Sequence, residues 1–269
     1  MVGRPFEESR MRAISTIRLR SIRGARLLSA PRLTALRLAL ASVAALALAI
    51  FITACENVSG YTQPTLVRVI DASYVAPAVN VTVNGTLIAA NIGQGAITSY
   101  GPLAGSNSAV ISVSATTGGP ALLYGNDYQF TAANQYSVFL VDSAAYPSGY
   151  EFTVLQDQQI AAAAGHSSYR FLNQAINTGA VDVYMIPSGV KIADAVPLIT
   201  ALPVNGTPSY VSFISQNVTM VITPTGVTKP AYTSTPIFLT GGEVRTVLIV
   251  DTQLTTNPPV AVFTGNDVN

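Results

Sequence analysis

A run of seventeen uncharged residues, 38–54, ends at Cys55, the only cysteine of the chain. The leader before this run carries nine of the fourteen basic residues, all of them arginine. A basic leader, an apolar run and a small-residue exit are typical of a secretory signal. As a helix the run would be about 25 Å long, slightly short of a bilayer crossing, so an uncleaved anchor is the alternative. The run therefore separates a targeting segment from a body that has to fold without it.

The exit of this run, Ile52-Thr53-Ala54-Cys55, resembles the bacterial lipobox. The resemblance implies that the cysteine thiol receives a diacylglyceryl group and that the signal is cut before it. Two or more acyl chains on Cys55 would anchor the protein firmly, whereas a single chain binds a membrane only marginally. Glu56 follows at the place where Asp commonly signals inner-membrane retention in Gram-negative lipoproteins, so the resemblance favours the outer membrane. We therefore expect an exported, lipid-anchored protein of the cell envelope.

The body after Cys55 is acidic and contains no further cysteine. It has five basic and eleven acidic residues. This balance argues against nucleic acid as a partner, because binding a phosphate backbone requires a basic face. With Cys55 used for lipid, disulfides, thiolate metal sites and cysteine nucleophiles are excluded. The fold must therefore be held by its core alone.

Short strands separated by turn residues fill the body. Val79, Val81 and Val83 alternate with polar residues, which is the period of a half-buried strand. Asn84-Gly85 lies between two such runs and predicts a type I′ hairpin. Further strands are expected at 97–103, 109–115, 135–142 and 150–156. The alternation places these further side chains in the cores: Phe139, Val141, Val181, Val183, Met185, Leu248 and Val250.

The strand pattern then starts again. Arg68 aligns with Arg170, and the run 136–142 aligns with 245–251 at a similar offset. We therefore predict an all-β fold, with two tandem antiparallel immunoglobulin-like β-sandwiches after an N-terminal helical signal segment. A closed barrel is the main alternative. The expected boundaries are a signal peptide at 1–54, a tether at 55–64, sandwiches at 65–157 and 167–269, and a linker at 158–166.

The two aligned first strands carry a resemblance to a known family. Val67-Arg68-Val69-Ile70-Asp71-Ala72-Ser73 and Arg170-Phe171-Leu172-Asn173 are each followed by Ala-Val-(Asn/Asp)-Val. They look like the domain of unknown function 4397 family, in which Arg-Val-Val-His-Ala-Ser-Pro leads into Ala-Val-Asp-Val-Tyr. The His of that family is Asp71 in one copy and Asn173 in the other. The resemblance implies secreted or surface-anchored bacterial proteins, often with tandem copies, and no known catalytic activity.

Few residues of the body suggest chemistry. The single histidine, His166, lies beside the linker, so Ser-His-Asp catalysis, Cys-His catalysis and zinc sites have no candidates. Acids recur at equivalent strand ends, as Asp142 with Asp251 and as Asp157 with Asp267. A carboxylate pair could serve a glycosidase or a calcium ion. An Asp at a strand end is more often a turn former, and we favour that interpretation.

Arg68 and Arg170 lie among apolar residues in the first strand of each copy. They could contact an anionic ligand, but we favour a structural role. In that role each guanidinium binds carbonyls or an acid of a neighbouring strand, with Asp182 as the candidate partner in the second copy. Tyr100 and Tyr210 occupy equivalent places before a turn and are expected to pack their rings and bond the backbone. Exposed tyrosines could instead stack on sugars.

Together these features predict a non-enzymatic, lipid-anchored cell-envelope protein. It would act as a surface binding, adhesion or structural module, with no cofactor and no metal. Its expected partners are the membrane, through Cys55, and an envelope protein or glycan. The alternative is a carbohydrate-binding surface lipoprotein, which would present a line of exposed tyrosines on one sheet. An envelope hydrolase is less favoured, because it would need two carboxylates that converge in a cleft.

Overall fold

Two pairs of β-sheets make up the body of the protein. The computed structural model describes residues 63–103, 108–116, 122–206, 209–253 and 259–268. The predictions for the signal peptide and for Cys55 fall on residues outside this described part. Within it the chain consists almost wholly of strands, and one 3-10 turn, η1 (Ile192–Asp194), is its only helical element. The prediction of an all-β fold with sandwich-like sheets is confirmed.

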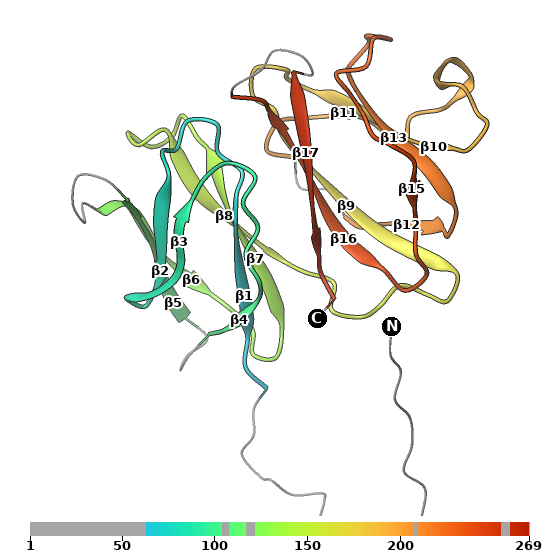
Figure 1. The fold of residues 1–269 in the computed structure, drawn as a ribbon. Helices are drawn as coiled ribbons and strands as arrows, with labels where there is room; N and C mark the ends of the chain where they lie inside the picture. The colour runs from blue at the N-terminus through green and yellow to red at the C-terminus, as the bar shows by residue number, and fades with distance from the viewer. Residues whose placement is uncertain (1–62, 104–107, 117–121, 207–208, 254–258, 269) are drawn as a thin grey trace, which may run out of the picture. The chain divides into compact units, whose positions relative to one another are not determined.

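The first half of the body, residues 63–157, forms two four-stranded sheets (Figure 1). One has the strand order β4-β1-β7-β8 and the other has the order β3-β2-β5-β6. The strands are β1 (Leu66–Asp71), β2 (Val79–Val83), β3 (Thr86–Ile92), β4 (Gly101–Pro102), β5 (Ser108–Ala115), β6 (Leu122–Gln129), β7 (Gln135–Asp142) and β8 (Tyr150–Gln156).

The second half, residues 166–268, repeats this order. One sheet is β12-β9-β16-β17, and the other is β11-β10-β13-β14 with β15 also paired to β13. β9, β10 and β16 thus take the places of β1, β2 and β7. The strands are β9 (His166–Gln174), β10 (Val181–Pro187), β11 (Ile199–Leu202), β12 (Val211–Ile214), β13 (Asn217–Pro224), β14 (Tyr232–Thr233), β15 (Ile237–Phe238), β16 (Val244–Asp251) and β17 (Val260–Asn266).

Each half contains one parallel pair of strands, which the antiparallel prediction did not include. β1 runs parallel to β7, and β9 runs parallel to β16. The other pairs of named strands are antiparallel. Parallel neighbours need a long crossover connection. In each half that connection passes through the other sheet of the sandwich, because the strands between β1 and β7, or between β9 and β16, belong mostly to it.

Local turn chemistry explains two details of the first half. Asn84 and Gly85 both have positive φ, at 48° and 77°, so the predicted type I′ hairpin joins β2 to β3. The strand expected over 97–103 shrinks to the two residues of β4, with Ile97 making one isolated bridge to Ile70. Pro102 has no N–H to donate, which limits β4 to a short edge strand.

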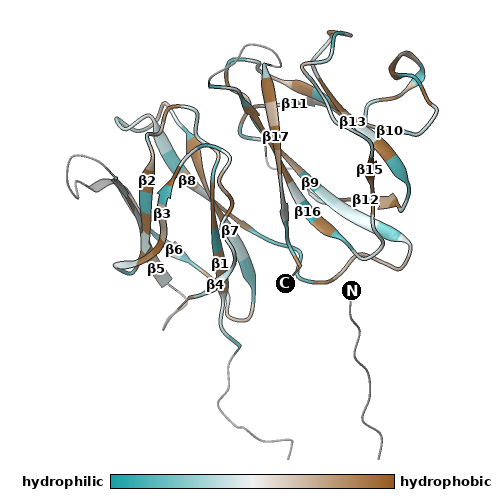
Figure 2. Ribbon diagram, viewed as in Figure 1, coloured by the Kyte–Doolittle hydropathy of each residue, from teal (hydrophilic) through white to brown (hydrophobic). Residues whose placement is uncertain are grey.

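Side-chain alternation along β2 and β10 builds the cores of the two sandwiches, and Figure 2 shows the alternation clearly on β2. Val79, Val81 and Val83 are buried in the first core. Val181 and Val183 are buried in the second, and Met185 is half-buried against it. These six positions therefore face inward as predicted.

Four other predicted core residues are buried in a different place. Phe139 and Val141 of β7, and Leu248 and Val250 of β16, form a third core that both halves share. Every residue of β7 is buried, so its odd and even side chains serve different cores and period two alone could not assign them. The third core is completed by Ile70, Ala72 and Leu172. Both halves accordingly belong to one compact unit.

Candidate functional site: a buried polar network between the two halves

Arg68 and Arg170 lie in the middle of β1 and β9, and both point away from the sandwich cores. On β1 the two neighbours of Arg68, Val67 and Val69, face the first core. Alternation along the strand therefore directs Arg68 to the opposite face of the sheet. The two arginines are only 2% and 3% exposed. A buried guanidinium requires a compensating charge and hydrogen bonds, because desolvation of an ion costs several kcal/mol.

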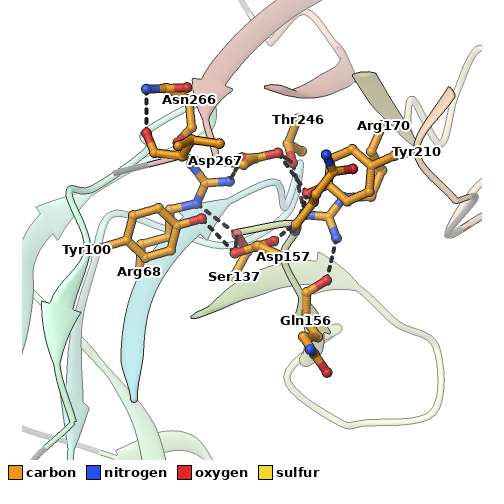
Figure 3. Close-up of polar contacts among 12 residues, drawn as sticks. Arg68, Tyr100, Ser137, Gln156, Asp157, Arg170, Tyr210, Thr246, Asn266 and Asp267 are labelled. Atoms are coloured by element: carbon orange, nitrogen blue, oxygen red, sulfur yellow. Dashed lines mark hydrogen bonds and ion pairs between the residues drawn. The ribbon is translucent and has the colours of Figure 1, made fainter. Parts of the chain in front are cut away.

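Arg68 finds its partners in both halves (Figure 3). Its Nη2 forms an ion pair with the carboxylate of Asp267, just past β17 of the second half. Its Nη1 donates to the carbonyl of Asn266 at 2.7 Å, and its Nε donates to Ser137 Oγ at 2.7 Å. The guanidinium also lies over the ring of Tyr100, 4.7 Å from its centroid.

Arg170 makes the equivalent contacts in the opposite direction. Its Nη2 donates to Asp157 Oδ1 at 2.5 Å and to Thr246 Oγ1 at 2.9 Å. Its Nη1 donates to the carbonyl of Gln156 at 3.2 Å. The guanidinium lies 4.8 Å from the centroid of the Tyr210 ring. Each arginine therefore stacks on a tyrosine of its own half and binds the terminal aspartate of the other half.

The two aspartates complete a pseudo-twofold arrangement, which Figure 3 shows as two facing clusters. Asp157 Oδ2 accepts hydrogen bonds from Tyr100 and Ser137, both at 2.7 Å. Asp267 Oδ2 accepts the equivalent bonds from Tyr210 and Thr246, both at 2.8 Å. Two buried cations thus balance two buried anions, and every carboxylate oxygen of the pair has a partner.

Burial governs the electrostatics of this network. Desolvation is the largest cause of the raised pKa of Asp267, which the nearby Arg68 guanidinium opposes and the Asp157 carboxylate reinforces. Desolvation likewise raises the pKa of Tyr100 and of Tyr210 above the ordinary value. Both phenols consequently remain protonated donors at physiological pH. The arrangement holds two sheets together and leaves its charged groups little access to an outside ligand.

The prediction that Asp182 is the partner of Arg170 is wrong. Asp182 lies on β10, which belongs to the other sheet of the second half. Its Oδ1 accepts hydrogen bonds from the Ala201 N–H at 2.7 Å and from Thr225 Oγ1 at 3.2 Å. Face-to-face sheets pack about 10 Å apart, and the Arg170 side chain points away from that interior. Asp182 therefore fastens β10 to its own neighbours instead of compensating the arginine.

Sequence reasoning missed the hydroxyl groups of the network. Ser137 and Thr246 are wholly buried and bind both an arginine and an aspartate. They occupy equivalent places in the aligned runs 136–142 and 245–251. A polar residue at the same register of two otherwise apolar strands was the available signal. Its meaning depended on the arginines, which lie 69 and 76 residues away in the sequence.

The two strand-end acids of each half, which a hydrolase would have to bring together, lie at opposite ends of a hairpin. Asp142 pairs with Tyr150 at one end of β7, whereas the Asp157 N–H donates to the Gln135 carbonyl at the other end. Asp251 and Asp267 are separated in the same way along β16. Within the described residues no group of three metal-ligating side chains could hold an ion.

Asp142 and Asp251 instead anchor the loops that follow β1 and β9. Asp142 accepts hydrogen bonds from Ser73 Oγ at 2.5 Å and from two backbone N–H groups, those of Tyr74 and Val75. Asp251 accepts the equivalent bonds from Asn177 N–H at 2.5 Å and from Thr178. These carboxylates are turn formers, in the role that the sequence analysis favoured.

Asp71, next to this anchor, is a buried acid with an unsatisfied oxygen. Its Oδ1 accepts a hydrogen bond from the Ser73 N–H at 3.1 Å, while its Oδ2 has no partner. Burial raises the pKa of Asp71 to about 7, and the nearby Asp142 carboxylate adds to the rise. The equivalent residue of the second half is Asn173, whose Nδ2 donates to the Gly179 and Leu202 carbonyls, both at 2.9 Å.

Two further features of the described part bear on function. His166 is partly exposed at the start of β9, with its Nδ1 3.2 Å from the Ala164 carbonyl. Among these residues the structure contains no helix long and apolar enough to cross a bilayer. The predicted lipidation site, Cys55, lies outside the described residues.

Comparison with known families supports the resemblance found in the first strands. Residues 65–184 match the model of a family described as "Domain of unknown function (DUF4397)". The matched region covers the whole first half and ends within β10 of the second. A comparison with curated proteins finds no match.

Proposed function

We propose that the protein is a non-enzymatic, lipid-anchored cell-envelope protein whose two halves act as one rigid binding or structural module. The observation that carries this proposal is the reciprocal network of Arg68 with Asp267 and Arg170 with Asp157. It lies beside the shared third core. A spacer or adhesion module needs a fixed geometry between its domains, and buried paired charges together with a shared core provide it.

The same network supports a role without catalysis. The two arginines offered as ligand contacts are buried and bound to Asp157 and Asp267. The other candidate acids are buried too, and their hydrogen bonds go to loops and neighbouring strands. Within each half the two strand-end acids lie at opposite ends of a hairpin. The Asp157 and Asp267 carboxylates do approach each other, but both are buried and bound to arginines. A hydrolase of the two-carboxylate kind needs its acids within about 5–9.5 Å of each other across a substrate. The chain's strand-end acids serve loops and the interface between the halves.

The carbohydrate-binding alternative receives less support than the structural one. It requires a line of exposed tyrosines on one sheet. Among the tyrosines whose side chains the structure describes, Tyr146 alone is exposed, and it lies in the β7–β8 turn. Tyr100 and Tyr210 are held in the network by their hydroxyl groups.

The repeated strand order supports two tandem copies of one domain, at 65–157 and 167–269. The register supports the same conclusion, since Arg68 lies opposite Ser137 in β7 and Arg170 lies opposite Thr246 in β16. The interface between the copies is isologous, as in a symmetric dimer. We infer that the linker joined two such domains without changing their contact surface.

Lipid anchoring is tested by metabolic labelling. Labelled palmitate should enter the wild-type protein in a bacterial host and should not enter Cys55→Ser. The variant should also leave the membrane fraction, because removal of the acyl chains removes the proposed anchor. Labelling of Cys55→Ser would refute the lipobox assignment. A pull-down from intact envelopes with the anchored protein would then show whether its partner is a protein or a glycan.

A further inference from the structure

A cavity of about 280 Å³ opens at one edge of the first half. It lies between β4, the edge strand of one sheet, and β3, the edge strand of the other. Its apolar lining comes mainly from Val67, Val83, Ile88 and Leu103, and its polar lining comes from Asn84, Thr86, Thr98 and Ser99. Sites for small organic ligands are apolar cavities with a few polar groups, and this volume lies just below their usual range of about 300–1,000 Å³.

The second half carries larger side chains at the equivalent positions. Val67 pairs with Gly101 between β1 and β4, as Tyr169 pairs with Val211 between β9 and β12. Tyr169 is therefore the equivalent of Val67. By the same register Phe213 is the equivalent of Leu103, and Met185 is the equivalent of Val83.

Aromatic rings thus occupy this place in the second half. Tyr169 and Phe213 pack edge to face, with ring centroids 5.8 Å apart and an interplanar angle of 80°. Tyr169 is only 2% exposed, and its hydroxyl donates to Glu243 Oε1 at 2.9 Å. At this place the second half contains a phenol ring, whereas the first half has the smaller side chain of Val67.

The aromatic pair of the first core does not replace these rings at the cavity. Phe130 and Tyr136 pack edge to face with centroids 5.0 Å apart. Tyr136 lies on β7 and is the register equivalent of Arg245 on β16. Its hydroxyl accepts a hydrogen bond from the Thr131 N–H. Neither ring is among the described residues that line the cavity.

We propose that the cavity of the first half is a binding site for a small phenolic compound. The ring would contact Val67, Ile88 and Leu103, and the phenol hydroxyl would meet the polar groups at the rim. Ser99 and Thr86 are exposed there, whereas the Thr98 hydroxyl is already bonded to the Val69 N–H and the Ser99 carbonyl. This site goes beyond the proposed envelope role and stands without it.

The probe for the test is 4-methylphenol, which is the tyrosine side chain as a free molecule. It would be titrated into the full chain in detergent, with the methyl groups of Val, Leu and Ile labelled for NMR. We expect saturable shifts of the Val67, Val83, Ile88 and Leu103 methyls, with a dissociation constant on the order of 1 mM for so small a ligand. Absence of saturation, or shifts confined to the second half, would overturn the proposal.

Filling the cavity provides the matched variant. Leu103→Phe introduces the second-half residue and should weaken binding by about tenfold or more, in the range that steric changes in apolar pockets produce. Ile214→Phe adds the same ring to β12 at a position that is 65% exposed, and it should leave binding unchanged. Equal binding to Leu103→Phe and to the wild type would contradict the assignment.

A second ligand tests the chemistry even if Leu103→Phe fails to fold. 4-Methylcyclohexanol has the same substituents on a thicker, saturated ring. It should bind the wild type at least about tenfold more weakly than 4-methylphenol, since its puckered ring is thicker than the planar ring that the equivalent place of the second half accommodates. Equal affinity for the two compounds would show that the site does not select a phenol.

Discussion

Replacement of Asp71 by Asn should stabilise the protein and remove part of its pH dependence. Asp71 is wholly buried at the end of β1, and its Oδ2 has no hydrogen-bond partner. The second half has Asn173 at the same register, where the amide makes two hydrogen bonds to carbonyls. Asp71→Asn therefore places in the first half the residue that the fold already accommodates in the second.

The direction and size of the change in stability with pH follow from the pKa of Asp71, which burial raises from 3.8 to about 7. The folded state holds the proton more tightly than the unfolded state, so stability is greatest below pH 4. It is lost as the pH rises through 7, because folding then requires a buried carboxylate to ionise. At about 1.4 kcal/mol for each pH unit, the wild type loses about 4 kcal/mol over this interval. Asp71→Asn has no proton to lose and avoids the loss.

Urea unfolding from pH 4 to pH 9 would measure this effect. The difference in unfolding free energy between Asp71→Asn and wild type should grow between pH 4 and pH 7 and then level off. Taking the difference cancels the titration of groups that do not interact with Asp71, such as Asp267. The matched control is Asn173→Asp, which should introduce the opposite dependence and also lose two amide donors. Parallel stability curves for Asp71→Asn and wild type would refute the proposed protonation of Asp71.

Two further predictions concern the interface between the halves. Arg68→Ala leaves Asp267 buried without its cation and should reduce stability by about 3–5 kcal/mol in urea unfolding; a loss below about 1 kcal/mol would contradict a buried, paired charge. Gly265→Ala would place its Cβ 2.8 Å from Arg68 Nη1 and should cost about 1–3 kcal/mol through overpacking. Gly93→Ala, whose Cβ would meet nothing within 4 Å, is the control and should change little, and equal effects of the two variants would refute the steric argument.

The strand pattern could be predicted from the sequence because it depends on local signals. Alternation identified Val79, Val81 and Val83, and Asn84-Gly85 set the hairpin between β2 and β3. The equivalence of Arg68 and Arg170 was visible as well, since a repeat needs only comparison of the chain with itself. The structure adds the register of β1 on β7 and of β9 on β16 to that equivalence.

The partners of the arginines could not be predicted in the same way. Arg68 binds a carboxylate 199 residues away, and no local signal distinguishes Asp267 from the other acids. Arg170 binds Asp157, 13 residues before it, which is about as near in sequence as Asp182. Only the sheet arrangement decides between the two acids, because β10 belongs to the opposite sheet. The third core was hidden for a related reason, because strands that are buried on both faces are apolar throughout and lose the period that reveals orientation.

β7 and β16, which meet at the interface, carry the same order of side chains on the face that they turn to each other: a hydroxyl residue first, and then two apolar residues. On β7 this face presents Ser137, then Phe139, then Val141, and on β16 it presents Thr246, Leu248 and Val250. The polar network therefore lies at one end of the contact and the apolar third core at the other. Separation of the halves would expose the apolar end to water and would deprive each buried aspartate of its arginine at the same time. Because each half supplies the cation for the anion of the other, neither half satisfies its own buried charges alone, and the folded stability of each copy depends on the presence of its neighbour.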